Sequence, residues 1–168
     1  MGANTVQNAD AQKALDSLRR IVRALRESSR MAERRFGLSG AQLFVLQKLA
    51  ESSAISLNDL ARLTHTHQSS VSTVVTRLVE RRLVRRVRSK KDARMLRLTL
   101  TPAGARLAKQ SPDIAQDRLA EAIESLPPGK REALASALGD VAKKVGGALG
   151  APTMFFEDRA PRKRRKPE

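Results

Sequence analysis

Residues 64–98, THTHQSSVSTVVTRLVERRLVRRVRSKKDARMLRL, decide the fold of this 168-residue chain. Apolar residues recur at helical spacing from Val71 to Leu78, which predicts an amphipathic helix near residues 68–81 with small polar side chains on its other face. Two short runs follow, at 84–88 and 95–99, and predict two strands around a polar turn. The stretch holds ten basic and two acidic residues, a net charge of +8 out of the chain's formal +16. A helix with a small polar face, followed by a basic hairpin, can fill a DNA groove and contact its flanks.

Two predicted helix starts precede this stretch. Ser39 and Gln42 have the spacing of a capping box, and Ser56 and Asp59 repeat it before a shorter helix. Residues 64–67 then connect the shorter helix to the amphipathic one. A short helix, a tight turn and a second helix are typical of a helix-turn-helix, and the basic hairpin takes the position of its wing.

The regions on either side of this lobe are predicted to be helical. Apolar residues recur at steps of three and four through residues 10–35, as in one long amphipathic helix. Thr101 followed by Pro102 predicts the start of a helical region over about 101–147, which Pro112 is expected to interrupt.

The outermost segments are polar or basic. Residues 1–9 are expected to be frayed, and residues 151–168 to form a basic tail that is disordered by itself. From Arg159 onward the tail holds six basic residues and one acidic residue. Two interpretations of the tail stay open: it adds non-specific affinity for nucleic acid, or it is a solubilising appendage.

Composition restricts the class of protein. A pI near 11.5 indicates a polyanionic partner, nucleic acid before an anionic membrane surface, because the charge lies on a helix–hairpin unit and a tail rather than on a basic amphipathic helix with bulky apolar anchors. The chain has no cysteine, so disulfides and thiol-based redox sensing are excluded. We find neither a signal-peptide pattern nor an apolar run of membrane-spanning length, and therefore expect a soluble, cytoplasmic protein.

The residues from Asp92 to Gly104, DARMLRLTLTPAG, carry the most specific pattern: Asp-x-Arg, five residues, then Leu-Thr-x-x-Gly. With the helix-turn-helix before it, this pattern resembles the wing signature of the MarR family of bacterial winged-helix regulators, over residues 11–146. The resemblance implies a mainly α-helical fold: a winged helix-turn-helix lobe at about 38–100 with a two-stranded β-wing, and N- and C-terminal dimerisation helices at about 10–35 and 101–147. This domain would span residues 10–150.

Two positions depart from the family pattern. Arg82 stands where the family usually has glycine, at the turn that leaves the recognition helix, and a left-handed conformation there is costly for arginine. His67 stands where the family often has Asp or Ser, near the start of that helix.

The expected DNA contacts fall into two groups. On the recognition helix, small hydroxyls allow close approach, while Gln and Arg can make bidentate contacts to bases or hold phosphate. These candidates are Gln68, Ser69, Ser72, Thr73, Thr76 and Arg77. On the wing the candidates are Arg88, Lys90, Lys91, Asp92 and Arg94. By the resemblance, Arg94 reaches the minor groove and Asp92 orients it, although Asp92 could instead bond only the turn backbone. The alternative for the helix face is an ordinary solvated surface.

The resemblance also implies a homodimer joined through the first and last helices. The candidate interface residues are Leu15, Leu18, Val22, Leu134, Leu138, Val141 and Val145. The alternative is that these apolar stripes pack within one subunit. In the family, a small aromatic or anionic ligand binds between the dimer helices and the DNA lobe. The residues Leu25, Met31, Phe36 and Phe44 could line such a pocket, but we favour a core position for them.

No enzyme is indicated, because the sequence has no catalytic cysteine, no phosphate-binding glycine loop and no recognisable pair of catalytic carboxylates. No cofactor is expected. His65 and His67 lie in one loop without an evident carboxylate partner, which makes a poor metal site. With the basic helix-turn-helix and wing, the resemblance implies a homodimeric, sequence-specific transcription regulator: a repressor on a pseudo-palindromic operator, released by a small ligand. The second hypothesis is an architectural protein that coats DNA with weak sequence preference.

Overall fold

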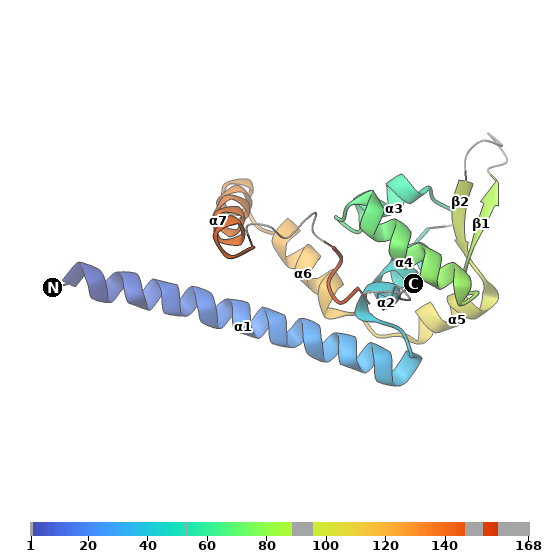
Figure 1. Cartoon of the computed structure of the whole chain (residues 1–168), viewed down its shortest axis with the longest axis horizontal. Coiled ribbons are helices and arrows are strands. Elements are labelled where there is room, and N and C mark those ends of the chain that lie inside the picture. The colour runs from blue at the N-terminus through green and yellow to red at the C-terminus, as the bar shows by residue number, and fades with distance from the viewer. Residues whose placement is uncertain (1, 53, 89–95, 147–152, 158–168) are drawn as a thin grey trace, which may run out of the picture.

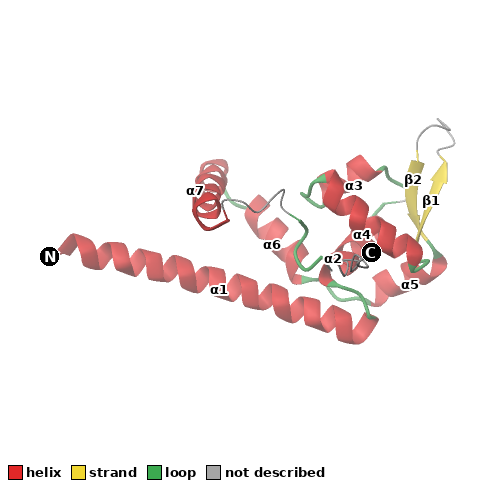
Figure 2. Cartoon of the chain, in the orientation of Figure 1, coloured by secondary structure: helices red, strands yellow, loops and turns green. Residues whose placement is uncertain are grey.

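The computed structural model shows a winged-helix lobe with helical arms, and it describes residues 2–52, 54–88, 96–146 and 153–157 (Figure 1). Within these residues helices predominate and the single sheet has two strands, so the predicted fold class is confirmed (Figure 2). The elements are α1 (Gly2–Phe36), α2 (Gly40–Ala50), α3 (Leu57–Leu63), α4 (Gln68–Glu80), β1 (Val84–Arg88), β2 (Leu96–Leu100), α5 (Pro102–Gln110), α6 (Ala115–Glu124) and α7 (Pro128–Gly146).

The boundaries of the elements agree with the predicted ones in part. The helix α1 includes residues 2–9, which the sequence predicts to be frayed; no proline or further glycine interrupts the chain there, and the helix can propagate through these residues. The second strand begins at Leu96 and ends at Leu100, one residue later than predicted. The C-terminal region is divided as Pro112 predicts, since α5 ends at Gln110 and α6 starts only at Ala115.

Both predicted capping boxes are formed. The Ser39 hydroxyl accepts from the backbone N–H of Gln42 at 3.3 Å, and the Gln42 side chain accepts from the N–H of Ser39 at 3.1 Å. Ser56 and Asp59 make the same reciprocal pair at the start of α3. Each box satisfies backbone donors that the first turn of a helix leaves without partners, so these two starts are determined locally.

The core lies between α2 and α4. Val71, Val74, Val75 and Leu78 are buried on one face of α4. They belong to the same hydrophobic cluster as the Phe44 side chain of α2. Burying a side chain of this size contributes about 1.5–3 kcal/mol, so this apolar face holds α4 in place and determines which face points to solvent.

The wing is an antiparallel hairpin that is tied back to the lobe. The register pairs Val84 with Leu100 and Arg88 with Leu96. In addition, Ile55 pairs with Leu98 through two backbone hydrogen bonds of 3.3 and 2.8 Å. The connection between α2 and α3 therefore supports the second strand of the wing.

The turn after α4 is left-handed at Arg82, with φ of 57°. The N–H of Arg82 bonds the carbonyl of Val79, and the N–H of Leu83 bonds that of Leu78, both at 2.9 Å. This pattern is a Schellman motif, in which glycine usually takes the left-handed position. Arg82 is therefore held in a backbone conformation that disfavours its side chain.

The arms extend away from the lobe. The N-terminal half of α1 runs past the lobe, and α7 lies beyond α6, apart from the core (Figure 1). None of the residues of α7 is buried. The described helices include none that is long and apolar enough to cross a membrane.

The chain returns to the lobe after α7. Met154 is only 3 % exposed and belongs to the hydrophobic core. The expectation of a disordered tail from residue 151 is therefore wrong for residues 153–157, because Met154 finds an apolar site between elements that are distant in sequence. Residues 158–168 lie outside the described part of the chain.

Candidate nucleic-acid interface

All six residues predicted to face DNA on the recognition helix lie on the solvent side of α4. Ser72 and Arg77 are half-buried, and the other four, Gln68, Ser69, Thr73 and Thr76, are exposed. The opposite face of the helix packs into the core. This division follows directly from the spacing of the valines, which is why the sequence could predict it.

The hydroxyl groups on this face are not equivalent. Thr73 donates to the backbone carbonyl of Ser69 at 3.2 Å, and Thr76 donates to that of Ser72 at 2.9 Å. A hydroxyl has one proton, so these threonines present lone pairs and methyl groups outward. Gln68, Ser69, Ser72 and Arg77 have no side-chain hydrogen bond with other described residues, and they are the groups on this face that can donate to base edges.

The N-terminal end of α4 carries neither an acidic residue in its first turn nor a side-chain cap. His67 occupies the N-cap position, but its side chain makes no capping hydrogen bond. The start of α4 is therefore without a side-chain cap from this residue. The first-turn amides and the positive end of the helix dipole suit a phosphate group.

The basic residues around the wing differ in their contacts: some are exposed, and others make hydrogen bonds within the protein. Arg88 is exposed at the end of β1. Lys90, Lys91, Asp92 and Arg94 lie outside the described residues. Arg85 donates to the Thr99 hydroxyl at 3.1 Å, and Arg97 donates to the carbonyl of Ala54 at 3.0 Å.

Two further arginines join the recognition helix to its surroundings. Arg86 of β1 donates to the Thr76 hydroxyl at 3.1 Å, and Arg81 donates to the carbonyl of Gly37 between α1 and α2. The sequence indicates only phosphate contact or solvation for these residues. No local signal could reveal the pairs, because the partners lie on different elements.

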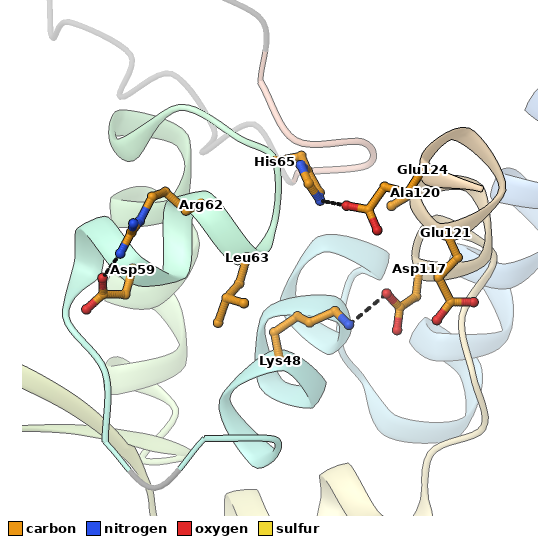
Figure 3. Close-up of a pocket in the computed structure, with 9 residues that line it drawn as sticks. All are labelled: Lys48, Asp59, Arg62, Leu63, His65, Asp117, Ala120, Glu121 and Glu124. Carbon is orange, nitrogen blue, oxygen red and sulfur yellow. Dashed lines mark hydrogen bonds and ion pairs between the residues drawn. The ribbon is translucent and has the colours of Figure 1, made fainter. Parts of the chain in front are cut away.

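A polar cavity of about 560 Å³ lies between the helix-turn-helix and α6 (Figure 3). Lys48 of α2 bonds Asp117 of α6 at 2.8 Å, and His65 bonds Glu124 of α6 at 2.7 Å. The expectation that His65 lacks a carboxylate partner is therefore wrong, since the fold brings Glu124 to it. Among the described residues, no group of three or more acidic or histidine side chains could hold a metal ion.

The Lys48 ammonium is subject to opposing effects. Burial lowers its pKa, but hydrogen bonds and charge interactions with Asp117 and Glu51 outweigh burial and raise the pKa above its ordinary value. Lys48 therefore stays protonated and links α2 to α6. The cavity holds both signs of charge, and these pairs within it reduce its attraction for a simple anion.

A second cavity, of about 470 Å³, lies beside the first. Its walls include Phe44, the Leu119 and Ile123 side chains of α6, and Thr66 and His67 before α4. Of the four residues considered as pocket walls, Phe44 lines this cavity while being buried itself, and Leu25 is buried. Met31 and Phe36 are half-buried.

The predicted dimer residues lie on the arms. Leu134 is half-buried, and the other six are exposed in this single chain, from 37 % for Leu18 to 84 % for Val145. The fold does not pack these stripes within the subunit, which contradicts the alternative interpretation for all six.

Known proteins with a similar sequence or fold are regulators of the winged-helix type. Residues 36–95 match the MarR family model. No curated protein sequence matches the chain. Among solved structures, BpsR of Bordetella bronchiseptica is 28 % identical with a TM-score of 0.53, covering 76 % of this chain and 91 % of BpsR.

Two other solved structures share the fold at lower identity. BldR, a transcriptional regulator of Sulfolobus solfataricus, is 21 % identical with a TM-score of 0.53, covering 81 % of this chain and 96 % of BldR. Reduced AbfR bound to DNA is 21 % identical with a TM-score of 0.54, covering 84 % of this chain and 97 % of AbfR. The family match is confined to residues 36–95, and the solved structures share the winged-helix fold, so this chain is similar to the MarR family of regulators.

Proposed function

We propose that the protein is a DNA-binding transcription regulator that acts as a homodimer. The observation that carries this proposal is the division of α4: a fully packed apolar face, and an outer face of Gln, Ser, Thr and Arg side chains without an acidic residue in the first turn. Small hydroxyls permit close approach to a groove, and Gln68 and Arg77 have the donors that base edges or phosphates accept. The proposed function is binding, not catalysis.

The second subunit is proposed to cover the arms. The large apolar side chains of α1 and α7 that stay exposed are Leu15, Leu18, Ile21, Val22, Leu138, Val141 and Val145. Two stripes of this size are costly to leave in water, and a second copy offers the same stripes in return. A two-fold dimer would present two α4 helices about one DNA turn apart to a pseudo-palindromic operator, with the wings, including Arg88, Lys90, Lys91, Asp92 and Arg94, at its flanks.

We also propose that the protein is a repressor and that a small ligand releases it from DNA. The DNA binding of BpsR is regulated by 6-hydroxynicotinic acid. In this chain, the cavity beside Phe44 combines apolar walls with His65 and His67, and it suits a small aromatic anion better than the charge-paired cavity around Lys48. A ligand there would alter the position of α4 relative to α6, and so the spacing of the two recognition helices.

The decisive experiment compares two duplexes of equal length at physiological salt: DNA from upstream of the protein's own gene, and a random sequence. A regulator should bind the first about 10³-fold or more tightly, whereas a ratio near one would favour the architectural coating protein. Arg77→Ala and Arg94→Ala should weaken specific binding, while Arg106→Ala, an exposed arginine on α5, should not. Titration with 6-hydroxynicotinic acid tests the ligand, which should weaken binding to the specific duplex.

A further inference from the structure

The segment 153–157 is packed against the lobe at one particular place. Met154 is buried against the core and lines the cavity beside Phe44, together with Leu119 and Ile123 of α6. The N–H of Glu157 bonds the carbonyl of Met154 at 3.2 Å, and Phe156 has a left-handed φ of 56°. The segment is therefore a defined turn with one apolar side chain inserted, and not a loose continuation of α7.

This place adjoins the start of the recognition helix. Thr66 and His67, which immediately precede α4, line the same cavity as Met154. His65 of the same turn is bonded to Glu124, and the pale red ribbon of the segment passes beside it in Figure 3. Because the Glu157 amide stays within hydrogen-bond distance of the Met154 carbonyl, the last described residue before the basic sequence lies near the N-terminal end of α4.

The sequence that follows is strongly basic. Residues 159–168 hold six basic residues and one acidic residue, namely Arg159, Arg162, Lys163, Arg164, Arg165, Lys166 and Glu168. Ten residues can span at most about 35 Å, roughly one turn of B-DNA. A polycation of this length that starts beside a helix in the groove can reach the phosphates on either side of it.

We infer that residues 153–157 are an anchor that fixes the origin of the basic tail beside α4, so that the tail binds backbone phosphates of the same duplex that the recognition helix reads. This inference rests on the proposed function. The anchor acts by shortening the tether: without it, the tail is connected only through residues 147–157 after α7, and its effective concentration near the DNA falls with the length of the free chain.

The experiment measures duplex affinity as a function of salt for the full chain and three variants. Truncation after Glu157 keeps the anchor and removes the tail, and should lower the slope of log affinity against log salt by about 0.9 for each phosphate that the tail neutralises in the full chain. Met154→Ser keeps the tail and releases the anchor, and should weaken binding about threefold to tenfold, to a value between wild type and truncation. Met154→Leu keeps an apolar side chain of similar volume and should bind as wild type.

A further variant covers the case in which Met154→Ser fails to fold. A ten-residue Gly-Ser spacer between Glu157 and Asp158 leaves the anchor and its burial intact but lengthens the tether, and should weaken binding without changing thermal stability. Equal affinity for the truncated and wild-type chains would overturn the inference and leave a solubilising tail, with the proposed function intact. Equal affinity for the spacer variant and wild type would overturn the anchoring role. If wild type and truncated chain both ignore DNA even at low salt, the proposed function and the inference fall together.

Discussion

Arg86 in the first strand of the wing donates from Nη2 to the hydroxyl of Thr76 in the recognition helix, 3.1 Å away. The same hydroxyl donates its proton to the carbonyl of Ser72, one turn earlier in α4. A single threonine therefore ties the wing to the helix backbone, and the two parts proposed to contact DNA are positioned relative to each other by a side-chain bond.

A double-mutant cycle measures this link. Thr76→Val and Arg86→Met should each lower the free energy of unfolding slightly, and their coupling should be about 0.5–1 kcal/mol, as for a solvent-accessible hydrogen bond. Urea unfolding of wild type, both single variants and the double variant gives the coupling directly. Thr73→Val with Arg86→Met is the matched control and should be additive, because Thr73 bonds only Ser69 among the described residues. Additive behaviour of the Thr76 pair would contradict the link.

Arg82 is expected to cost stability where it stands. Its φ of 57° lies in the left-handed region, so Arg82→Gly should raise the free energy of unfolding by about 0.5–1 kcal/mol, measured by chemical denaturation. Arg81→Gly is the control: Arg81 has a φ of −78°, and glycine there should lower stability by loosening the backbone and removing the bond to Gly37. A destabilised Arg82→Gly variant would mean that the arginine side chain stabilises this turn by more than its backbone conformation costs.

Gly104 is required by a close approach of the backbone. A Cβ at this position would lie 2.1 Å from the carbonyl oxygen of Leu83, which also accepts the N–H of Thr101 at 3.0 Å. Gly104→Ala must therefore displace backbone at the junction of the wing and α5, and should lower the free energy of unfolding by about 2 kcal/mol or more. Gly129→Ala, where an added Cβ meets no atom within 4 Å, should change it by no more than about 0.5 kcal/mol. Equal effects of the two substitutions would show that the junction yields easily.

The capping box of α3 should make stability depend on pH. Hydrogen bonds from Ser56 and Arg62 hold the pKa of Asp59 below its ordinary value of 3.8. A carboxyl group whose pKa is lower in the folded than in the unfolded state stabilises the fold at pH values above its unfolded pKa. This contribution is lost as the pH falls through the folded pKa. Asp59→Asn should therefore be less stable than wild type at pH 7, and the difference should shrink below about pH 3.8. Urea unfolding from pH 7 to pH 3 checks this; a difference that is constant over that range would contradict it.

If α7 lies in the proposed dimer interface, charged residues on its apolar stripe should prevent dimerisation. Leu138→Glu and Val141→Glu place carboxylates on the exposed stripe of α7 and should convert the dimer to monomer, measured by light scattering after size-exclusion chromatography. Leu63→Glu, an equally exposed leucine on α3 in the lobe, should leave the dimer intact. If the wild-type protein is itself a monomer at micromolar concentration, the two-fold arrangement is wrong.

The sequence by itself determined the elements whose causes are local. The valine spacing in α4 decides which face is buried, Ser39 with Gln42 and Ser56 with Asp59 decide where two helices begin, and Pro112 decides where the C-terminal region is broken. Each of these rests on residues within a few positions of one another, so a single sequence contains the whole reason. The polar face of α4 could be predicted for the same reason, because it is what the buried face leaves outside.

The tertiary structure decided the contacts between distant elements. The pairing of Arg86 with Thr76, the partner of His65 on α6 and the burial of Met154 depend on where whole helices lie. A charged or apolar side chain in a sequence shows what kind of partner it needs, but not which partner packing will bring within reach. Arg81 and Arg86, which the sequence places only in solvent or against phosphate, make hydrogen bonds to other elements of the fold. Met154, in a tail that composition predicts to be disordered, is buried because the assembled core offers it an apolar site.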